Sequence, residues 1–277
     1  MKYFLGCELT YDIAANTTMI LNVEVQRGSS QTIISERFVA PPGVEPQVHE
    51  VPETGNRYQR LHLLPGTSVI RYEAEVITSP TVHDPASVVD IAVTDLPFEV
   101  LNHLYPSRYC QSDRLARFAW REFGSIEGSF QKVTGICNWI FDHVDYIAGT
   151  SDGSTSALET FDYRAGVCRD FAHLGITLTR ALGIPARYVS VYAFGLVPQD
   201  FHAIFEAYVG GRWYLFDATR LIPIDGVVRI AIGRDAADTA FSTFYGQLVD
   251  QPKKVWIDRL DGEALEAEWT TSAVSLG

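Results

Sequence analysis

The first third of the chain alternates between apolar and polar residues with the two-residue period of half-buried β-strands. Residues 21–26 and 69–76 alternate strictly, and clusters of Gly, Pro and Ser separate such runs. This period predicts short strands with one buried face, and their spacing predicts an antiparallel β-sandwich. Prolines and turn-forming residues gather between residues 78 and 97. We therefore place a β-rich N-terminal domain at residues 1–95 and a second domain at residues 96–277.

Beyond that boundary the apolar residues recur at three- and four-residue spacing, which is the period of amphipathic helices. A first helix is predicted to begin at Ser112, with Trp120 on its apolar side. A second is expected at about residues 129–145, and a third from near Cys168 to Gly183, where Gly and Pro mark its end. The second domain is thus predicted to combine helices with strands in an α+β fold.

Three β segments follow the third helix, at residues 186–194, 202–209 and 212–219. The last two flank Gly210-Gly211, and a two-residue connection of this kind predicts a tight hairpin. In that hairpin Val209 faces Arg212, and the pairing continues residue by residue away from the turn. The register of both strands is therefore predicted from the turn alone.

The predicted register places His202, Ile204, Asp217 and Thr219 on one face of the hairpin. Asp217 is then a diagonal neighbour of His202, about 7–8 Å away between backbone positions. A carboxylate and an imidazole can join across that distance by a hydrogen bond. The opposite face carries mainly aromatic residues and alanines and is interpreted as core, so the face with His202 need not be core.

Composition and charge narrow the class of protein. The 277 residues include 22 Lys+Arg and 34 Asp+Glu, which gives a net charge of −12. This acidity argues against a nucleic-acid partner, because neutralising phosphates requires a basic face. No apolar run reaches the length of a membrane span, and the N-terminal apolar run is too short for a signal peptide. Four scattered cysteines indicate neither a zinc site nor a disulfide scaffold. We expect a cytoplasmic protein with no membrane partner.

Cys168 is the candidate nucleophile. It stands at the predicted start of the third helix, where the positive end of the helix dipole favours a thiolate. A thiolate beside an imidazole that a carboxylate orients is the arrangement that nucleophilic catalysis requires. Backbone N–H groups at the same helix end can stabilise an oxyanion.

Four ordered motifs resemble the bacterial transglutaminase-like superfamily. They are GVCRDFAHL at 166–174, GIPARY at 183–188, HAIFEA at 202–207 and WYLFDAT at 213–219. The resemblance covers about residues 100–245, and the β-rich first part looks like the domain that commonly precedes this core in bacterial members.

This resemblance implies a papain-like α+β core, with the catalytic Cys on a helix packed against an antiparallel sheet. It implies that Cys168 is the nucleophile, His202 the general acid/base and Asp217 the residue that orients the imidazole, with no cofactor. One departure is Ile204, where members often carry a Trp two residues after the catalytic His. We expect this change to alter substrate fit and to leave the mechanism intact.

Other polar residues compete for these roles. Asp200 precedes His202 by two residues and is the rival orienting carboxylate. His173 lies about 140° around the helix from Cys168 and is given a structural role, and Glu206 is too far along the strand, at about 13 Å from His202.

The neighbours of Cys168 in sequence also have other interpretations. Arg169 and Asp170 are interpreted as capping or supporting residues. Tyr146 either lines the cleft or is a buried hydroxyl. Residues 149–153 match the G-x-S-x-G pattern of serine hydrolases, but they lie in a Gly/Ser/Thr loop over residues 147–156. Because that motif requires a helix directly after it, we regard the match as chance.

We expect an enzyme that acts on the amide bonds of a protein or peptide through a Cys168 thioester. Water as the second substrate gives a peptidase or amidase, and an amine gives a crosslinking transglutaminase. We favour hydrolysis, because crosslinking inside a cell is the narrower role. The other hypothesis is a non-catalytic interaction module that keeps the fold and binds a partner through its β-rich half. The sequence does not indicate the oligomeric state.

Overall fold

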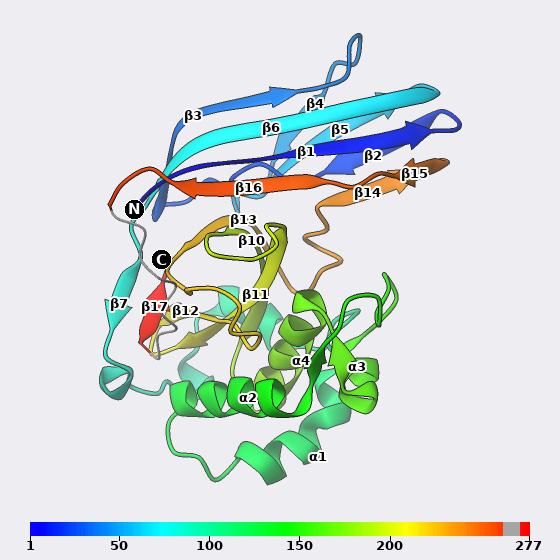
Figure 1. Ribbon diagram of the computed structural model, residues 1–277. Helices are drawn as coiled ribbons and strands as arrows, with labels where there is room; N and C mark the ends of the chain where they lie inside the picture. Colours follow the sequence, from blue (N-terminus) through cyan, green and yellow to red (C-terminus); the bar gives the residue numbers. More distant parts are fainter. Residues whose placement is uncertain (263–271) are drawn as a thin grey trace.

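Strands from both ends of the chain build a two-layered β-sandwich in the computed structural model, which describes residues 1–262 and 272–277 (Figure 1). One sheet has the order β15-β1-β6-β3 with β16 also paired to β1, and the other has the order β14-β2-β5-β4. The strands of the first half are β1 (Lys2–Ile13), β2 (Thr17–Leu21), β3 (Gln31–Val39), β4 (Gln47–Glu50), β5 (Arg57–Leu63) and β6 (Gly66–Thr78). All pairs in both sheets are antiparallel, which confirms the predicted sandwich.

One predicted strand of the sandwich is wrong. Residues 69–76 do lie in β6, but β2 ends at Leu21 and residues 22–26 are not in a strand. All five of these residues are buried, and the polar ones, such as Glu24 and Gln26, bond to other buried groups. The alternation there reflects buried polar contacts and not an exposed strand face.

Three strands from the C-terminal part of the chain complete the sandwich. They are β14 (Ser242–Tyr245), β15 (Leu248–Asp250) and β16 (Lys254–Arg259), and they pair with β1 and β2. The division at residues 95 and 96 stays a prediction, but the chain returns after residue 241 to the sheets of its first half. A sheet edge exposes unpaired N–H and C=O groups, and these strands cover the edges of β1 and β2.

The other main part of the fold, outside the sandwich, is an antiparallel sheet of order β12-β11-β10-β13, with helices against one face (Figure 1). We call it the catalytic sheet, because two of the three residues predicted to be catalytic, His202 and Asp217, lie in or directly after its strands. Its strands are β10 (Ala186–Ala193), β11 (Phe201–Val209), β12 (Arg212–Phe216) and β13 (Val227–Gly233). The helices are α1 (Ser112–Phe123), α2 (Ser129–His143), α3 (Ala157–Tyr163) and α4 (Cys168–Ala181). Smaller elements are β7 (Thr81–His83), β8 (Asp145–Tyr146), β9 (Ala165–Gly166), β17 (Ala273–Ser275), η1 (Pro85–Ser87), η2 (Val93–Asp95) and η3 (Phe98–His103).

The three predicted helices are present, and α3 was not predicted. Trp120 is 56% exposed, so its assignment to the apolar side of α1 is wrong. The buried line of α1 runs through Leu115, Ala119 and Phe123, at the four-residue spacing of one helix face. None of the described helices is long and apolar enough to cross a membrane.

The hairpin of β11 and β12 has the predicted register from the Val209–Arg212 pair to the Phe205–Phe216 pair. The strand predicted to continue over residues 217–219 is wrong, because β12 ends at Phe216 and a turn follows it. Val209 pairs with Arg212, and Gly210 and Gly211 have φ angles of 59° and 81°. Such left-handed angles at both turn positions match the right-handed twist of the strands. The hairpin face that carries His202 and Ile204 was not expected to be core, but it is buried, since Ile204 is only 1% exposed. Apolar residues of the later chain cover it: Ile222, Ile224, Val274 and Leu276.

The sandwich and the catalytic sheet share one apolar core. Tyr192 of β10 and Val228 and Ile230 of β13 are fully buried in the same cluster as the sandwich side chains. The Tyr192 hydroxyl donates a hydrogen bond to the Val23 carbonyl at 2.7 Å. The sandwich and the catalytic sheet therefore cannot separate without exposing apolar surface.

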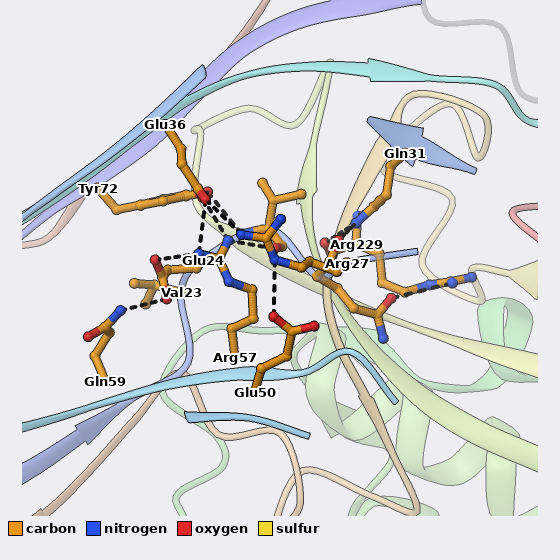
Figure 2. A network of polar contacts seen from close by, with 12 residues as sticks. Val23, Glu24, Arg27, Gln31, Glu36, Glu50, Arg57, Gln59, Tyr72 and Arg229 are labelled. Carbon is orange, nitrogen blue, oxygen red and sulfur yellow. Dashed lines mark hydrogen bonds and ion pairs between the residues drawn. The ribbon is translucent and has the colours of Figure 1, made fainter. Parts of the chain in front are cut away.

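The ion pairs of the buried Arg57 reinforce the sandwich side of this junction. Figure 2 shows Arg57 between two carboxylates, with its guanidinium 3.0 Å from Glu24 and 2.6 Å from Glu36. The Tyr72 hydroxyl also donates to Glu36, at 2.9 Å. Burial raises the pKa of Glu24 despite the positive charge of Arg57. At Glu36, burial also opposes the charged form, but the bonds from Arg57 and Tyr72 outweigh it and lower the pKa.

A second buried carboxylate, Glu206 on β11, joins three strands. Arg187 of β10 contacts it at 2.6 Å and Arg229 of β13 contacts its other oxygen. Gln31 of the sandwich bonds both the N–H and the carbonyl of Arg229, at 2.9 and 2.8 Å; Figure 2 shows this contact. Burial would raise the pKa of Glu206, but the two guanidinium groups outweigh it and lower that pKa. The carboxylate is thus held charged inside the protein.

Replacing Glu206 tests how far the fold depends on this cluster. Glu206→Ala leaves two buried guanidinium groups without their carboxylate, and we expect the free energy of unfolding to fall by about 3–5 kcal/mol. Urea unfolding measures it. The control is Glu75→Ala, because the Lys2–Glu75 pair has side chains that are 39% and 28% exposed and exposed pairs contribute at most about 1 kcal/mol. Equal losses in the two variants would contradict the assignment.

Candidate active site

Cys168 is the one cysteine of the four that is not buried; Cys7, Cys110 and Cys137 are buried, and all four are free thiols. Burial raises the pKa of Cys7 and of Cys110 to about 12, and it raises the pKa of Cys137 further. These three thiols are therefore protonated and shielded. Cys168 is the first residue of α4 and is half-buried, so its sulfur is accessible at the helix N-terminus.

Asp170 fixes the start of α4. Its buried carboxylate accepts hydrogen bonds from the Val167 N–H at 2.9 Å and from the Ser151 hydroxyl at 2.5 Å. Arg169 contacts Asp170 at 3.1 Å and donates to the Asp152 carbonyl. Both residues thus support the helix start, as predicted, and they hold the 147–156 loop against it. Ser151 is used in this contact within the loop, which agrees with a chance G-x-S-x-G match.

His202 and Asp217 form the predicted pair. The Nε2 atom of His202 lies 3.0 Å from Asp217 Oδ2, and both side chains are at most 5% exposed. The other carboxylate oxygen accepts from the Thr219 N–H at 2.9 Å and from the Thr219 hydroxyl at 2.7 Å. Both oxygens of Asp217 are therefore held, and the carboxylate in turn orients the imidazole.

This contact sets the proton positions on His202. With Nε2 donating to Asp217, the neutral ring has a free lone pair on Nδ1. Nδ1 is buried and has no hydrogen-bond partner among the described residues. Burial opposes protonation of the ring, but the charges of Asp217 and Cys168 outweigh it and raise the pKa of His202 to about 10.

Cys168 and His202 line the same cleft, of about 420 Å³. Aromatic side chains form much of its wall: Tyr109, Tyr188, Phe201 and Phe241. The structure thus brings the three predicted site residues together, since Cys168 and His202 line one cleft, the charge of Cys168 raises the pKa of His202, and Asp217 is hydrogen-bonded to His202. We refer to this space as the catalytic cleft.

The rival residues have other roles. Asp200 lines the cleft, but its carboxylate pairs with Lys253 at 3.2 Å. His173 is fully buried, stacks on Tyr109 at 4.9 Å and accepts from the Ala236 N–H at 3.1 Å. Burial lowers the pKa of His173 well below its usual value, so this ring is a neutral structural residue.

The sequence left the roles of Tyr146 and Ile204 open, and the structure shows where each side chain lies. Tyr146 is 45% exposed, and partial burial together with the charge of neighbouring Cys168 raises its pKa. It therefore stands beside the thiol and is not a buried hydroxyl. Ile204 packs with Val189 and Leu215 in the core, so the Trp-to-Ile departure affects packing at this position and not the cleft wall.

Two polar residues of the site were missed from sequence. Thr219 fixes Asp217 from the turn after β12, and its place two residues after an Asp could have indicated such a local hydrogen bond. Ser190 lines the cleft with a buried hydroxyl that has no partner among the described residues, and no sequence signal pointed to it. In the described part of the chain, no group of three or more His, Cys, Asp or Glu side chains is arranged to hold a metal ion.

Comparisons with known proteins place the chain in a family. A model described as "Transglutaminase-like superfamily" matches residues 119–218, and one described as "Bacterial transglutaminase, N-terminal domain" matches residues 1–99. A solved candidate cysteine protease from Cytophaga hutchinsonii is 43% identical, with a TM-score of 0.95 over 99% of this chain and 97% of that chain. The chain belongs to the transglutaminase-like superfamily. Family and relative together support a cysteine enzyme and confirm the predicted fold class.

Other matches are more distant. An uncharacterised protein of Mycobacterium leprae is 35% identical over 159 residues, and the match spans 54% of this chain and 56% of that protein. The periplasmic domain of TgpA from Pseudomonas aeruginosa is 16% identical with a TM-score of 0.41, over 78% of this chain and 90% of that domain. At that score the likeness bears on neither activity nor location.

The stability of this transglutaminase-like protein should report the His202–Asp217 pair through its pH dependence. The folded pKa of about 10 lies above the unfolded value of about 6.5. The stabilisation is thus complete below about pH 6.5 and is lost as the pH rises through about 10. We expect Asp217→Asn to lower the free energy of unfolding most near pH 6 and least near pH 10. Urea unfolding of wild type, Asp217→Asn and the control Asp200→Asn across this range checks it. A deficit in Asp217→Asn that is independent of pH contradicts it.

Proposed function

We propose that this protein hydrolyses amide bonds of a peptide or protein through a thioester on Cys168. One observation carries the proposal: an imidazole whose Nε2 is held by a carboxylate and whose Nδ1 is free lies in the cleft that Cys168 lines. A thiol, a base and a group that orients the base are the parts of a Cys–His–Asp triad. The net charge of −12 supports a protein or peptide as partner over a nucleic acid.

In the first half-reaction the proton of the Cys168 thiol is held on Nδ1 of His202, because the raised pKa of His202 favours the imidazolium. The sulfur then forms a bond to the carbonyl carbon of the amide, and the C=O electron pair moves to oxygen. Backbone N–H groups at the start of α4 are suited to stabilise this oxyanion. The C–N bond breaks as His202 returns the proton to the nitrogen, so the amine leaves and the thioester remains. Asp217 stabilises this imidazolium.

In the second half-reaction water attacks the thioester. His202 takes a proton from the water, the oxygen bonds to the carbonyl carbon, and the C–S bond breaks. The sulfur leaves with the proton from His202, which restores the thiol and releases a carboxylic acid. An amine in place of water would give an amide and make the protein a transferase. The 43% identical relative is named as a candidate cysteine protease, which favours water.

The acceptor is tested with peptide and isopeptide libraries in ¹⁸O-labelled water, with methylamine present and absent. We expect new carboxylates that carry ¹⁸O, few methylamides, and neither product from Cys168→Ala. Mass spectrometry distinguishes the outcomes. Methylamides as the main product would support the transferase, and the absence of any Cys168-dependent product would support the non-catalytic module.

The roles within the triad are tested by rate. With the best substrate from the libraries, we expect Cys168→Ala and His202→Ala to lower kcat by about 10³-fold or more. Asp217→Asn should lower it by about 10²- to 10⁴-fold, because the imidazole loses its orientation. Asp200→Asn is the matched control, since Asp200 lines the same cleft. An Asp200→Asn loss as large as that of Asp217→Asn would contradict the assignment.

We also propose that the protein works in the cytoplasm. Four free thiols, three of them buried, support a reducing compartment, and a Cys nucleophile needs its thiol reduced. Fractionation of the source cells, with the protein detected by antibody, checks this; recovery outside the cytoplasm contradicts it.

A further inference from the structure

A second cavity, of about 710 Å³, lies between the sandwich and the catalytic sheet. We call it the junction cavity. Its walls include Asn56 and Tyr58 of the sandwich, His103 of η3, and Arg187 and Trp213 of the catalytic sheet. Its volume is in the range of small-molecule sites, about 300–1,000 Å³.

The junction cavity is separate from the catalytic cleft. The segment 236–243 stands between them: Ala240 borders both, Ala237 and Asp238 line only the junction cavity, and Ala236 and Thr239 line only the cleft. Neither Cys168 nor His202 lines the junction cavity. The proposed peptidase chemistry therefore does not explain what this space holds.

Two side chains of the junction cavity have hydrogen-bonding groups that the described residues leave unused. The Arg187 guanidinium lies over the Trp213 ring at 4.1 Å, and the His103 ring meets the same indole edge-on at 5.2 Å. Among the described residues, Arg187 makes a hydrogen bond only through Nε, to Glu206, and His103 Nδ1 is buried with no partner. Buried polar atoms are normally paired, so a bound group between these two side chains would satisfy both.

The charged residues around Arg187 and His103 favour binding of an anion in the junction cavity. Arg187 is 8% exposed and shares the single carboxylate of Glu206 with Arg229. Arg180, also buried, bonds only to carbonyl and hydroxyl oxygens among the described residues. Burial and the positive charges of Arg187 and Arg180 lower the pKa of His103 to about 3. An anion here would meet a positive potential in a desolvated place, where charge-assisted hydrogen bonds are strong.

The remaining charges limit the kind of anion. Asp238 is neutralised by Arg234 at 2.9 Å. Glu53 and Glu99 also line the junction cavity, and both are exposed whereas Arg187 is buried. They would repel a second negative group near the opening, so a ligand with one oxyanion fits better than a polyanion.

We propose that the junction cavity binds a small organic molecule with a single oxyanion, a carboxylate or a phosphate, held by Arg187 and His103 beside Trp213. The neutral ring of His103 would donate one hydrogen bond to the oxyanion through its Nδ1–H. The N–H groups of Arg187 that Glu206 does not use would donate two more. Carboxylates and phosphates would be recognised in the same way, because several N–H donors can converge on the oxygen atoms of either anion.

The proposal is tested by NMR titration of the full chain with sodium acetate, glycine or sodium phosphate, at constant ionic strength with chloride. We expect saturable shifts of the Trp213 indole N–H, assigned with Trp213→Phe. His103→Phe keeps a ring against Trp213 and removes Nδ1, and we expect it to weaken binding at least about 10-fold, as for loss of one hydrogen bond to a charged group. The control His49→Phe changes an exposed residue of β4 and should bind as wild type does.

The three probes identify the anion, since acetate or glycine alone indicates a carboxylate ligand and phosphate alone indicates a phosphate ligand. Arg187→Lys keeps a positive charge for Glu206 but removes the fork of donors, and it should weaken the same probe. If it does not fold, His103→Phe decides. The absence of saturable shifts with all three probes at 20 mM, or equal binding by wild type and His103→Phe, would overturn the proposal.

Discussion

The buried carboxylate of Glu206 holds together three strands of the catalytic sheet, one of which is bonded to the sandwich, and the geometry of the candidate active site depends on it. It binds guanidinium groups from both β10 and β13, and β13 is bonded to Gln31 of the sandwich. A buried charge is costly unless it is paired, so β11 is stable only in the register that places Glu206 between these two groups. His202 is four residues away on the same strand, and that register also sets its position in the cleft.

The other two site residues are positioned by different means. Cys168 is carried by α4, and a Cβ on Gly175 would lie 2.5 Å from the Phe205 ring. The absence of a side chain at Gly175 therefore lets α4 approach β11 closely. Asp217 follows the end of β12 and is held by Thr219. A helix start, a strand start and a strand end thus converge, which is how rigid elements hold a reactive geometry.

The parts that could be predicted from sequence are those that local chemistry determines. Gly210-Gly211 requires a two-residue turn, so the hairpin register and the neighbourhood of His202 and Asp217 followed from it. The strand expected at 21–26 failed because alternation was taken to mean one buried and one exposed face, whereas the polar residues there are buried too, in contacts with distant polar groups. The pairing of β14–β16 with β1 and β2 was not predicted, because no local period records which distant strand is the partner. The transglutaminase-like resemblance assigned the roles but could not show that Ile204 faces the core.

The return of the chain to the sandwich also shapes the cleft. Phe241, Ser242 and Lys253 line the cleft, and they lie in or beside the strands that complete the two sandwich sheets. One wall of the cleft is therefore fixed by the packing of the β-rich half, although the three candidate site residues all belong to the other half. The segment 236–243 that leads into this wall also borders the junction cavity. A change in how the sandwich sits on the catalytic sheet would move this wall relative to Cys168, so substrate fit depends on the whole chain.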